Sequence, residues 1–116
     1  MTATLPEVLA SLERTPATLR AWLADLPAAW TDSHDGPETW SPHEVVAHLC
    51  EGERVDWMPR LRIILAHGGA RPFTPFDRLA HQTEADDTDL PTLLDRFAAL
   101  RTDNLADLRA MDLSDA

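Results

Sequence analysis

The stretch of sequence that decides the fold is Trp40-Ser41-Pro42-His43-Glu44-Val45-Val46-Ala47-His48-Leu49. Ser-x-x-Glu ahead of an apolar run is a capping box, in which each of the two side chains accepts a hydrogen bond from the other residue's backbone N–H. Proline suits the first helical position because its φ is already helical and its missing N–H is not needed there. The stretch therefore predicts a helix that begins at Pro42, with Trp40 just outside it as a hydrophobic staple.

This helix is predicted to continue to about Ala66, where a pair of glycines ends it. Its apolar residues recur at helical spacing along one side, namely Val45, Val46, Leu49, Trp57, Leu61, Ile64 and Leu65. Pro59 removes one backbone donor, so we expect the helix to bend after about Asp56.

Apolar spacings of three and four also predict a helix over residues 5–26. We expect it to be broken or kinked at Thr15 and Pro16, which could cap and open a second segment. Residues 27–39 have turn composition and no periodic apolar face, and are therefore predicted to form a surface loop.

A short helix is predicted around residues 76–80, ended by the acidic run at residues 84–89. A last long helix is predicted to start after a cap at Thr88 or Asp89 and to reach Met111. No convincing strand pattern interrupts these helices, so the sequence predicts an all-α antiparallel bundle.

The composition fits one domain, residues 1–116, because a single core normally serves a chain of 116 residues. The lone Cys50 excludes an internal disulfide framework.

Twenty acidic against ten basic residues give a net charge of -10, which argues against nucleic acid as a partner. No apolar run approaches the ~18 residues of a membrane span, and no signal peptide is recognisable. We therefore expect a cytoplasmic protein without a membrane partner.

His48 is the first candidate metal ligand, because it lies in the second turn of the capped helix beside its apolar face. Glu44 and Glu51 lie four residues before and three after it, on the same helical side. One helix alone cannot close a zinc site, which needs about three converging protein ligands. The alternatives stay open: Glu44 has a capping role, Glu51 could be solvated, and His48 could be a hydrogen-bonded core residue.

His81 is the second candidate ligand and pairs with Asp77 at a spacing of four, although a surface salt link is the favoured interpretation of that pair. The other three histidines are expected to face solvent: His34, His43 and His67. Cys50 is interpreted as a small apolar filler, and the four tryptophans as core anchors. The sequence contains no H-x-x-x-H pair, no phosphate loop and no nucleophile elbow.

The capping-box stretch of residues 40–49, followed by Glu53, Trp57 and Arg60, resembles the DinB/YfiT-like superfamily. The flanks agree with it, since residues 12–26 resemble the opening helix and residues 97–108, with Arg101, resemble the third long helix. The resemblance thus covers nearly the whole chain.

This resemblance implies an up-down-down-up four-helix bundle, commonly a homodimer, that holds a divalent metal such as zinc or nickel through three histidines. The first of these histidines would be His48. Glu44 or Glu53 would at most contact the ligands without binding the metal. The family's other two histidines come from an H-x-x-x-H pair on a final helix, and this sequence departs from the pattern by ending before one.

Family members with known roles include enzymes that join a low-molecular-weight thiol to a small electrophile. The sequence thus favours a metal-dependent enzyme of this kind, inactive as the short chain unless further ligands are supplied. The alternative is a non-catalytic helical module for dimerisation or small-molecule binding. An uncovered apolar stripe leads us to expect homodimers in both cases.

Overall fold

The computed structural model describes residues 2–73, 77 and 79–113, and the regular structure within these ranges is helical throughout. The helices are α1 (Leu5–Leu23), α2 (Ala28–Thr31), α3 (Pro42–Val55), α4 (Trp57–His67), α5 (Gln82–Asp87) and α6 (Leu90–Ala110). The prediction of an all-α fold is confirmed. None of these helices is long and apolar enough to cross a membrane.

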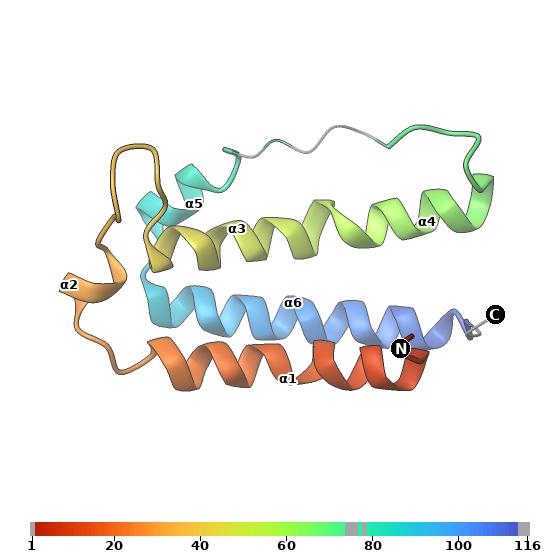
Figure 1. Cartoon of the computed structure of the whole chain (residues 1–116), viewed down its shortest axis with the longest axis horizontal. Coiled ribbons are helices and arrows are strands. Elements are labelled where there is room, and N and C mark those ends of the chain that lie inside the picture. The colour runs from red at the N-terminus through yellow and green to blue at the C-terminus, as the bar shows by residue number, and fades with distance from the viewer. Residues whose placement is uncertain (1, 74–76, 78, 114–116) are drawn as a thin grey trace.

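Three long rods make up the molecule, and α6 lies between α1 and the rod formed by α3 and α4 (Figure 1). The chain runs one way along α1 and the opposite way along both α3–α4 and α6 (Figure 1). This is the up-down-down order expected of the bundle. The far end of α4 and the start of α5 lie toward opposite ends of the molecule (Figure 1).

The core is built on one face of α6, whose buried residues are Leu90, Leu93, Leu94, Phe97, Arg101, Leu105 and Leu108. Residues from the neighbouring rods pack against this face, including Leu23 of α1 and Val46, Ala47 and Cys50 of α3. Two of the tryptophans do not act as core anchors, because Trp22 is 70% and Trp30 is 68% exposed. They lie at the end of the molecule where α1 leads into α2.

The capping box predicted at the start of α3 is present. Ser41 Oγ accepts from the Glu44 N–H at 3.2 Å, and Glu44 Oε1 accepts from the Ser41 N–H at 3.1 Å. The long helix is interrupted at Asp56, between α3 and α4, which is the position where a bend was expected. α4 ends at His67, and Gly68, which follows it, has a positive φ of 59° that glycine readily adopts.

α1 is one helix with Pro16 inside it, so of the two expected outcomes, a break or a kink, the break into two segments is wrong. The helix also ends three residues earlier than predicted, at Leu23. Within the loop predicted at residues 27–39, residues 28–31 form the short helix α2.

The short helix expected around residues 76–80 is wrong in position. Phe76 and Arg78 lie outside the described residues, residues 79–81 form a turn, and the helix α5 falls on the acidic run that was expected to end it. Tertiary ion pairs explain the difference, because Glu84 accepts from Arg54 Nη1 at 3.1 Å and from Arg96 Nη1 at 2.6 Å. These pairs neutralise part of the run and join α5 to α3 and α6.

Candidate functional site

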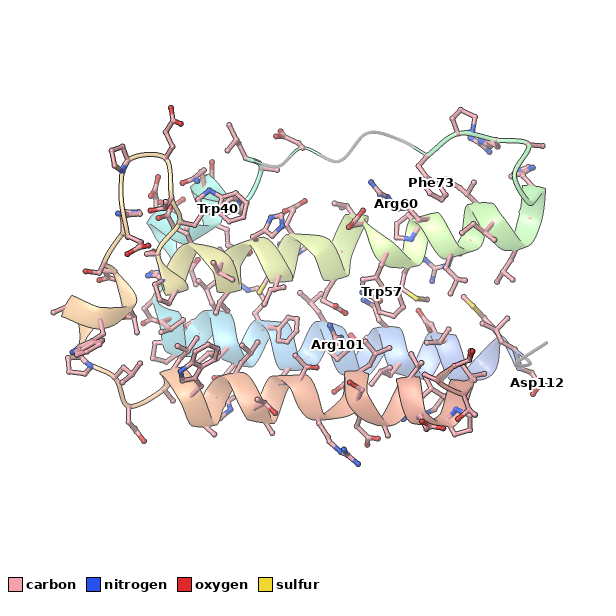
Figure 2. The ribbon with its side chains drawn as sticks, in the orientation of Figure 1. Trp40, Trp57, Arg60, Phe73, Arg101 and Asp112 are labelled. Atoms are coloured by element: carbon pink, nitrogen blue, oxygen red, sulfur yellow. The ribbon has the colours of Figure 1, made fainter. Side chains whose placement is uncertain are left out.

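Three aromatic rings meet where α3 begins and the chain enters α5. The His48 ring lies 4.7 Å from Trp40 and 5.2 Å from His81, measured between ring centroids. The Trp40 and His81 centroids are 4.4 Å apart. Trp40 lies beside α5 and the start of α3 (Figure 2). The structure thus brings together the two histidines that the sequence ranked first and second, although they are 33 positions apart.

His81 is completely buried, with 0% of its surface exposed, so its interpretation as part of a surface salt link is wrong. Asp77 instead accepts a hydrogen bond from the Leu79 N–H at 3.0 Å. The Nε2 of His81 lies 3.3 Å from the amide nitrogen of Gln82. Among the described residues, no hydrogen-bond partner lies within reach of its Nδ1.

The remaining histidines lie away from this ring cluster. His43 is not solvent-facing as expected, because its Nε2 donates to the Thr88 carbonyl at 2.7 Å and its Nδ1 lies 3.2 Å from Asp32 Oδ1. His34 is half-exposed and contacts Glu44. His67 is exposed at the end of α4, as predicted.

Glu44 is held by its capping role. Desolvation raises the pKa of this carboxyl, but the Ser41 N–H, the His34 ring and the Gln82 amide all hydrogen-bond to the charged form. The balance lowers the pKa to about 2. Glu44 is thus an ionised acceptor that connects the start of α3 to Gln82, the residue next to His81.

Glu53 lies at the centre of the bundle, 4% exposed, and both of its carboxylate oxygens are used. Its Oε1 accepts from Arg101 Nη2 at 2.6 Å and from Trp57 Nε1 at 2.8 Å, while its Oε2 accepts from Asn104 Nδ2 at 3.0 Å. Figure 2 shows Trp57 and Arg101 in the region between α3–α4 and α6. Burial raises the pKa of Glu53, but the hydrogen bonds from these three residues outweigh it and lower the pKa below its usual value.

Glu51, the remaining candidate, is partly buried on α3, and its Oε2 lies 3.6 Å from Arg54 Nη1. The sequence interpretation missed two partners of Glu53, namely the charge of Arg101 and the amide of Asn104. Arg101 follows Phe97 and precedes Leu105 by four residues, on the apolar face of α6. A charge at such a position signals a buried partner.

The described residues do not complete a metal centre. No group of three or more His, Cys, Asp or Glu side chains among them is arranged to hold an ion. A catalytic zinc takes about three protein ligands, whereas the ring cluster supplies two imidazoles. Cys50 adds no thiolate, because its thiol is buried and donates to the Leu93 carbonyl at 3.5 Å. Desolvation raises the pKa of this thiol to about 12.

An apolar groove of about 470 Å³ adjoins the ring cluster, between the end of α1 and the start of α3. Three indoles line it, from Trp22, Trp30 and Trp40, together with aliphatic side chains such as Leu26 and Val45. Trp40 therefore has two sets of neighbours: it lines the groove and contacts both histidine rings. A small apolar molecule in the groove would lie against Trp40, the residue that the groove and the ring cluster share.

Comparison with known proteins gives a family. Residues 11–116 match the family model of the DinB superfamily. The fold is similar to that of YfiT from Bacillus subtilis, described as a probable metal-dependent hydrolase with an unusual four-helix bundle topology. The TM-score is 0.77 at 20% identity, over 98% of this chain and 66% of YfiT, so the chain spans about two thirds of that relative. No curated protein matches the sequence. Because the family model covers nearly all of the chain, this protein belongs to the DinB superfamily.

Proposed function

We propose that this chain functions in a DinB-type metal-dependent enzyme, to which it contributes His48 as a metal ligand. The observation that carries the proposal is the meeting of the His48 and His81 rings, 5.2 Å apart, beside an apolar groove. Imidazole nitrogens suit zinc and nickel alike. The further ligands of a complete centre would come from outside the described residues.

The reaction we propose joins a low-molecular-weight thiol to a small electrophile. The groove supports a substrate with an apolar body, because indole and aliphatic side chains line it. Its volume of about 470 Å³ lies within the usual range for small-molecule pockets. Cys50 would take no part as a nucleophile, since a buried thiol whose pKa is about 12 carries no thiolate near neutral pH.

The test is a thiol-transfer assay on protein loaded with zinc or nickel, with glutathione or cysteine as thiol and 1-chloro-2,4-dinitrobenzene as electrophile. We expect product formation above the uncatalysed rate in wild type, and its loss in His48→Ala. His67→Ala is the matched control, because His67 is exposed at the end of α4. Equal rates in wild type and His48→Ala would overturn the assignment of His48.

A second function is favoured by a different observation. Trp22 and Trp30 expose about 70% of their surface at one apolar groove, an unusual concentration for side chains of this size. A non-catalytic helical module that associates through this groove, or binds a small molecule there, would need neither a metal nor His48. Thiol transfer and metal binding that both depend on His48 would rule this module out.

A further inference from the structure

A second cavity, of about 250 Å³, lies between α2 and the starts of α3 and α6, which meet at one end of the molecule (Figure 1). It shares Leu26 with the apolar groove, but none of the three indoles lines it. One part of its wall is apolar and includes Leu90 and Pro91. The polar residues that line it are Thr31, Asp32, His43 and Asp89. The proposed metal site uses none of these residues.

Thr31 of α2 brings an unused hydroxyl to this cavity. The residue lines the cavity and is only 4% exposed. Its hydroxyl forms no hydrogen bond with another residue in the described part of the chain. Because a buried polar group without a partner is costly, we expect this hydroxyl to bond to an occupant of the cavity.

The ring of His43 and the carboxylate of Asp32 bring two acceptors to the same cavity. The Thr88 carbonyl can only accept, so His43 Nε2, which lies 2.7 Å from it, carries a proton. In the neutral ring Nδ1 is then an acceptor, and it lies 3.2 Å from Asp32 Oδ1. Two adjacent acceptors need a donor, which is either a second ring proton or the N–H groups of a cationic ligand.

The charges around the cavity favour a cation. Asp89 accepts from the Thr92 N–H at 2.9 Å, and its hydrogen bonds with Thr92 hold the pKa of this carboxyl below the usual value. Together with Asp32 it gives the cavity two carboxylates against one imidazole. No three His, Cys, Asp or Glu side chains among the described residues are arranged to hold a metal ion. An organic cation, whose hydrocarbon part can lie on the apolar wall, therefore fits this cavity better than a metal ion does.

We propose that this cavity binds a small organic ammonium ion, whose N–H groups donate to Asp32 Oδ1 and His43 Nδ1. The Thr31 hydroxyl accepts a further N–H, and the hydrocarbon part lies against Leu26 and Leu90. A volume of about 250 Å³ is below the usual range for drug-sized ligands, so the ligand has only a few carbon atoms. The site is separate from the proposed metal centre and does not depend on it.

The first test measures binding of n-butylammonium chloride to metal-free protein, from ¹H–¹⁵N correlation spectra at pH 8 and constant ionic strength. Asp32→Asn and Thr31→Val keep the shapes of their side chains but remove the charge and the hydroxyl. We expect dissociation constants about tenfold and about threefold higher than that of wild type, respectively. Asp87→Asn is the matched control and should bind as wild type does, because Asp87 is exposed on α5 and does not line the cavity.

1-Butanol is the matched neutral probe, because it has the same hydrocarbon part and no charge. It should bind to wild type at least about tenfold more weakly, since it lacks the charge-assisted hydrogen bonds. Equal affinities for the two probes, or equal n-butylammonium affinity in wild type, Asp32→Asn and Thr31→Val, would overturn the proposal. Absence of n-butylammonium binding by wild type at about 50 mM would also overturn it, since even an inefficient ligand of this size binds in that range.

The second test uses the titration of His43. The charged groups that face its ring are Asp32 at the end of α2 and Asp89 at the start of α6. Glu44, its neighbour on α3, contacts His34 instead. At low pH a second ring proton occupies Asp32 and the charged ring repels the ligand, so wild type should bind n-butylammonium several-fold more tightly at pH 8 than at pH 5.5.

His43→Gln is the control for this titration, because its amide keeps a donor toward Thr88 but does not titrate. Its affinity should change much less between the two pH values, while the n-butylammonium ion keeps its charge at both. A wild-type affinity that is the same at pH 5.5 and pH 8 would overturn the shared use of Asp32 that the proposal requires.

Discussion

Arg101 of α6 is the residue that connects α6 to both other rods by hydrogen bonds. The residue is 8% exposed, and its guanidinium donates to the Leu12 carbonyl of α1 at 2.8 Å and to Glu53 of α3 at 2.6 Å. A buried ion pair of this kind is weak evidence for net stability, but removing one partner leaves the other charge buried and unpaired. Arg101 and Glu53 are therefore mutually dependent.

We expect Arg101→Met to lower the free energy of unfolding by about 3–5 kcal/mol, because it leaves the buried Glu53 carboxylate without its counter-charge. The measurement is urea unfolding followed by circular dichroism. Arg109→Met is the control, since that guanidinium pairs with Glu13 on the surface and should cost less than about 1 kcal/mol. Equal losses in the two variants would contradict this role of Arg101.

The lowered pKa of the Glu44 carboxyl predicts that the stability of the fold depends on pH. Its pKa is lowered from 4.5 to about 2 in the folded state. A carboxyl with a depressed folded pKa stabilises the fold above its unfolded pKa, and this stabilisation is lost as the pH falls toward the folded value. The Glu44→Gln variant keeps a capping side chain but lacks the charge.

We therefore expect Glu44→Gln to melt at a lower temperature than wild type at pH 6, with the difference shrinking between pH 4.5 and about pH 2. Melting curves at half-unit pH intervals measure it. Glu38→Gln serves as control, because Glu38 is exposed and its substitution should leave the melting temperature at pH 6 close to that of wild type. A difference that stays constant with pH would contradict the ionised, hydrogen-bonded state of Glu44.

At the scale of elements, α1 contains a proline that removes one helical hydrogen bond, and a side chain of α6 replaces this bond. Pro16 has no N–H to offer the carbonyl four residues earlier, that of Leu12, and Arg101 of α6 donates to this carbonyl instead. The helix therefore continues through Pro16, although the local sequence predicts a break or a kink there.

This compensation predicts coupling between two helices. In the Pro16→Ala background, an N–H in α1 can bond to the Leu12 carbonyl, so Arg101→Met should cost less there. We expect a coupling of about 1 kcal/mol, the usual worth of one hydrogen bond. A double-mutant cycle from urea unfolding measures it, and strictly additive losses would contradict the compensation.

The elements also show what local sequence can and cannot predict. The capping box at Ser41 and Glu44 lies within four residues, so its pattern located the start of α3 correctly. α5 was misplaced because its acidic residues are stabilised by Arg54 and Arg96, which are 30 and 12 positions away from Glu84. The meeting of His48 with His81 depends on the same placement, so the sequence could name both histidines but could not bring them together.

At the scale of the whole molecule, the apolar groove between α1 and α3 is the most exposed hydrophobic feature that the structure describes. Trp22 and Trp30 together expose roughly 300 Å² there, which is comparable to the largest apolar patch of a typical monomer. In the non-catalytic alternative, the proposed homodimer would use this surface, because burying two indoles supplies much of the stability of a small interface.

We expect the wild-type chain to elute as a dimer in size-exclusion chromatography with light scattering, and the Trp22→Gln/Trp30→Gln double variant as a monomer. Leu79→Gln is the control, since Leu79 is 63% exposed but does not line the groove. A wild-type chain that stays monomeric at high micromolar concentration would contradict this proposal.

The most direct test of the proposed metal site is a calorimetric titration of metal-free protein with zinc. Wild type should bind zinc, His48→Ala should bind at least tenfold more weakly, and His67→Ala should match wild type. That result would place an ion at the ring cluster. Zinc binding that is the same in all three proteins, or absent from wild type, would contradict a metal centre at His48.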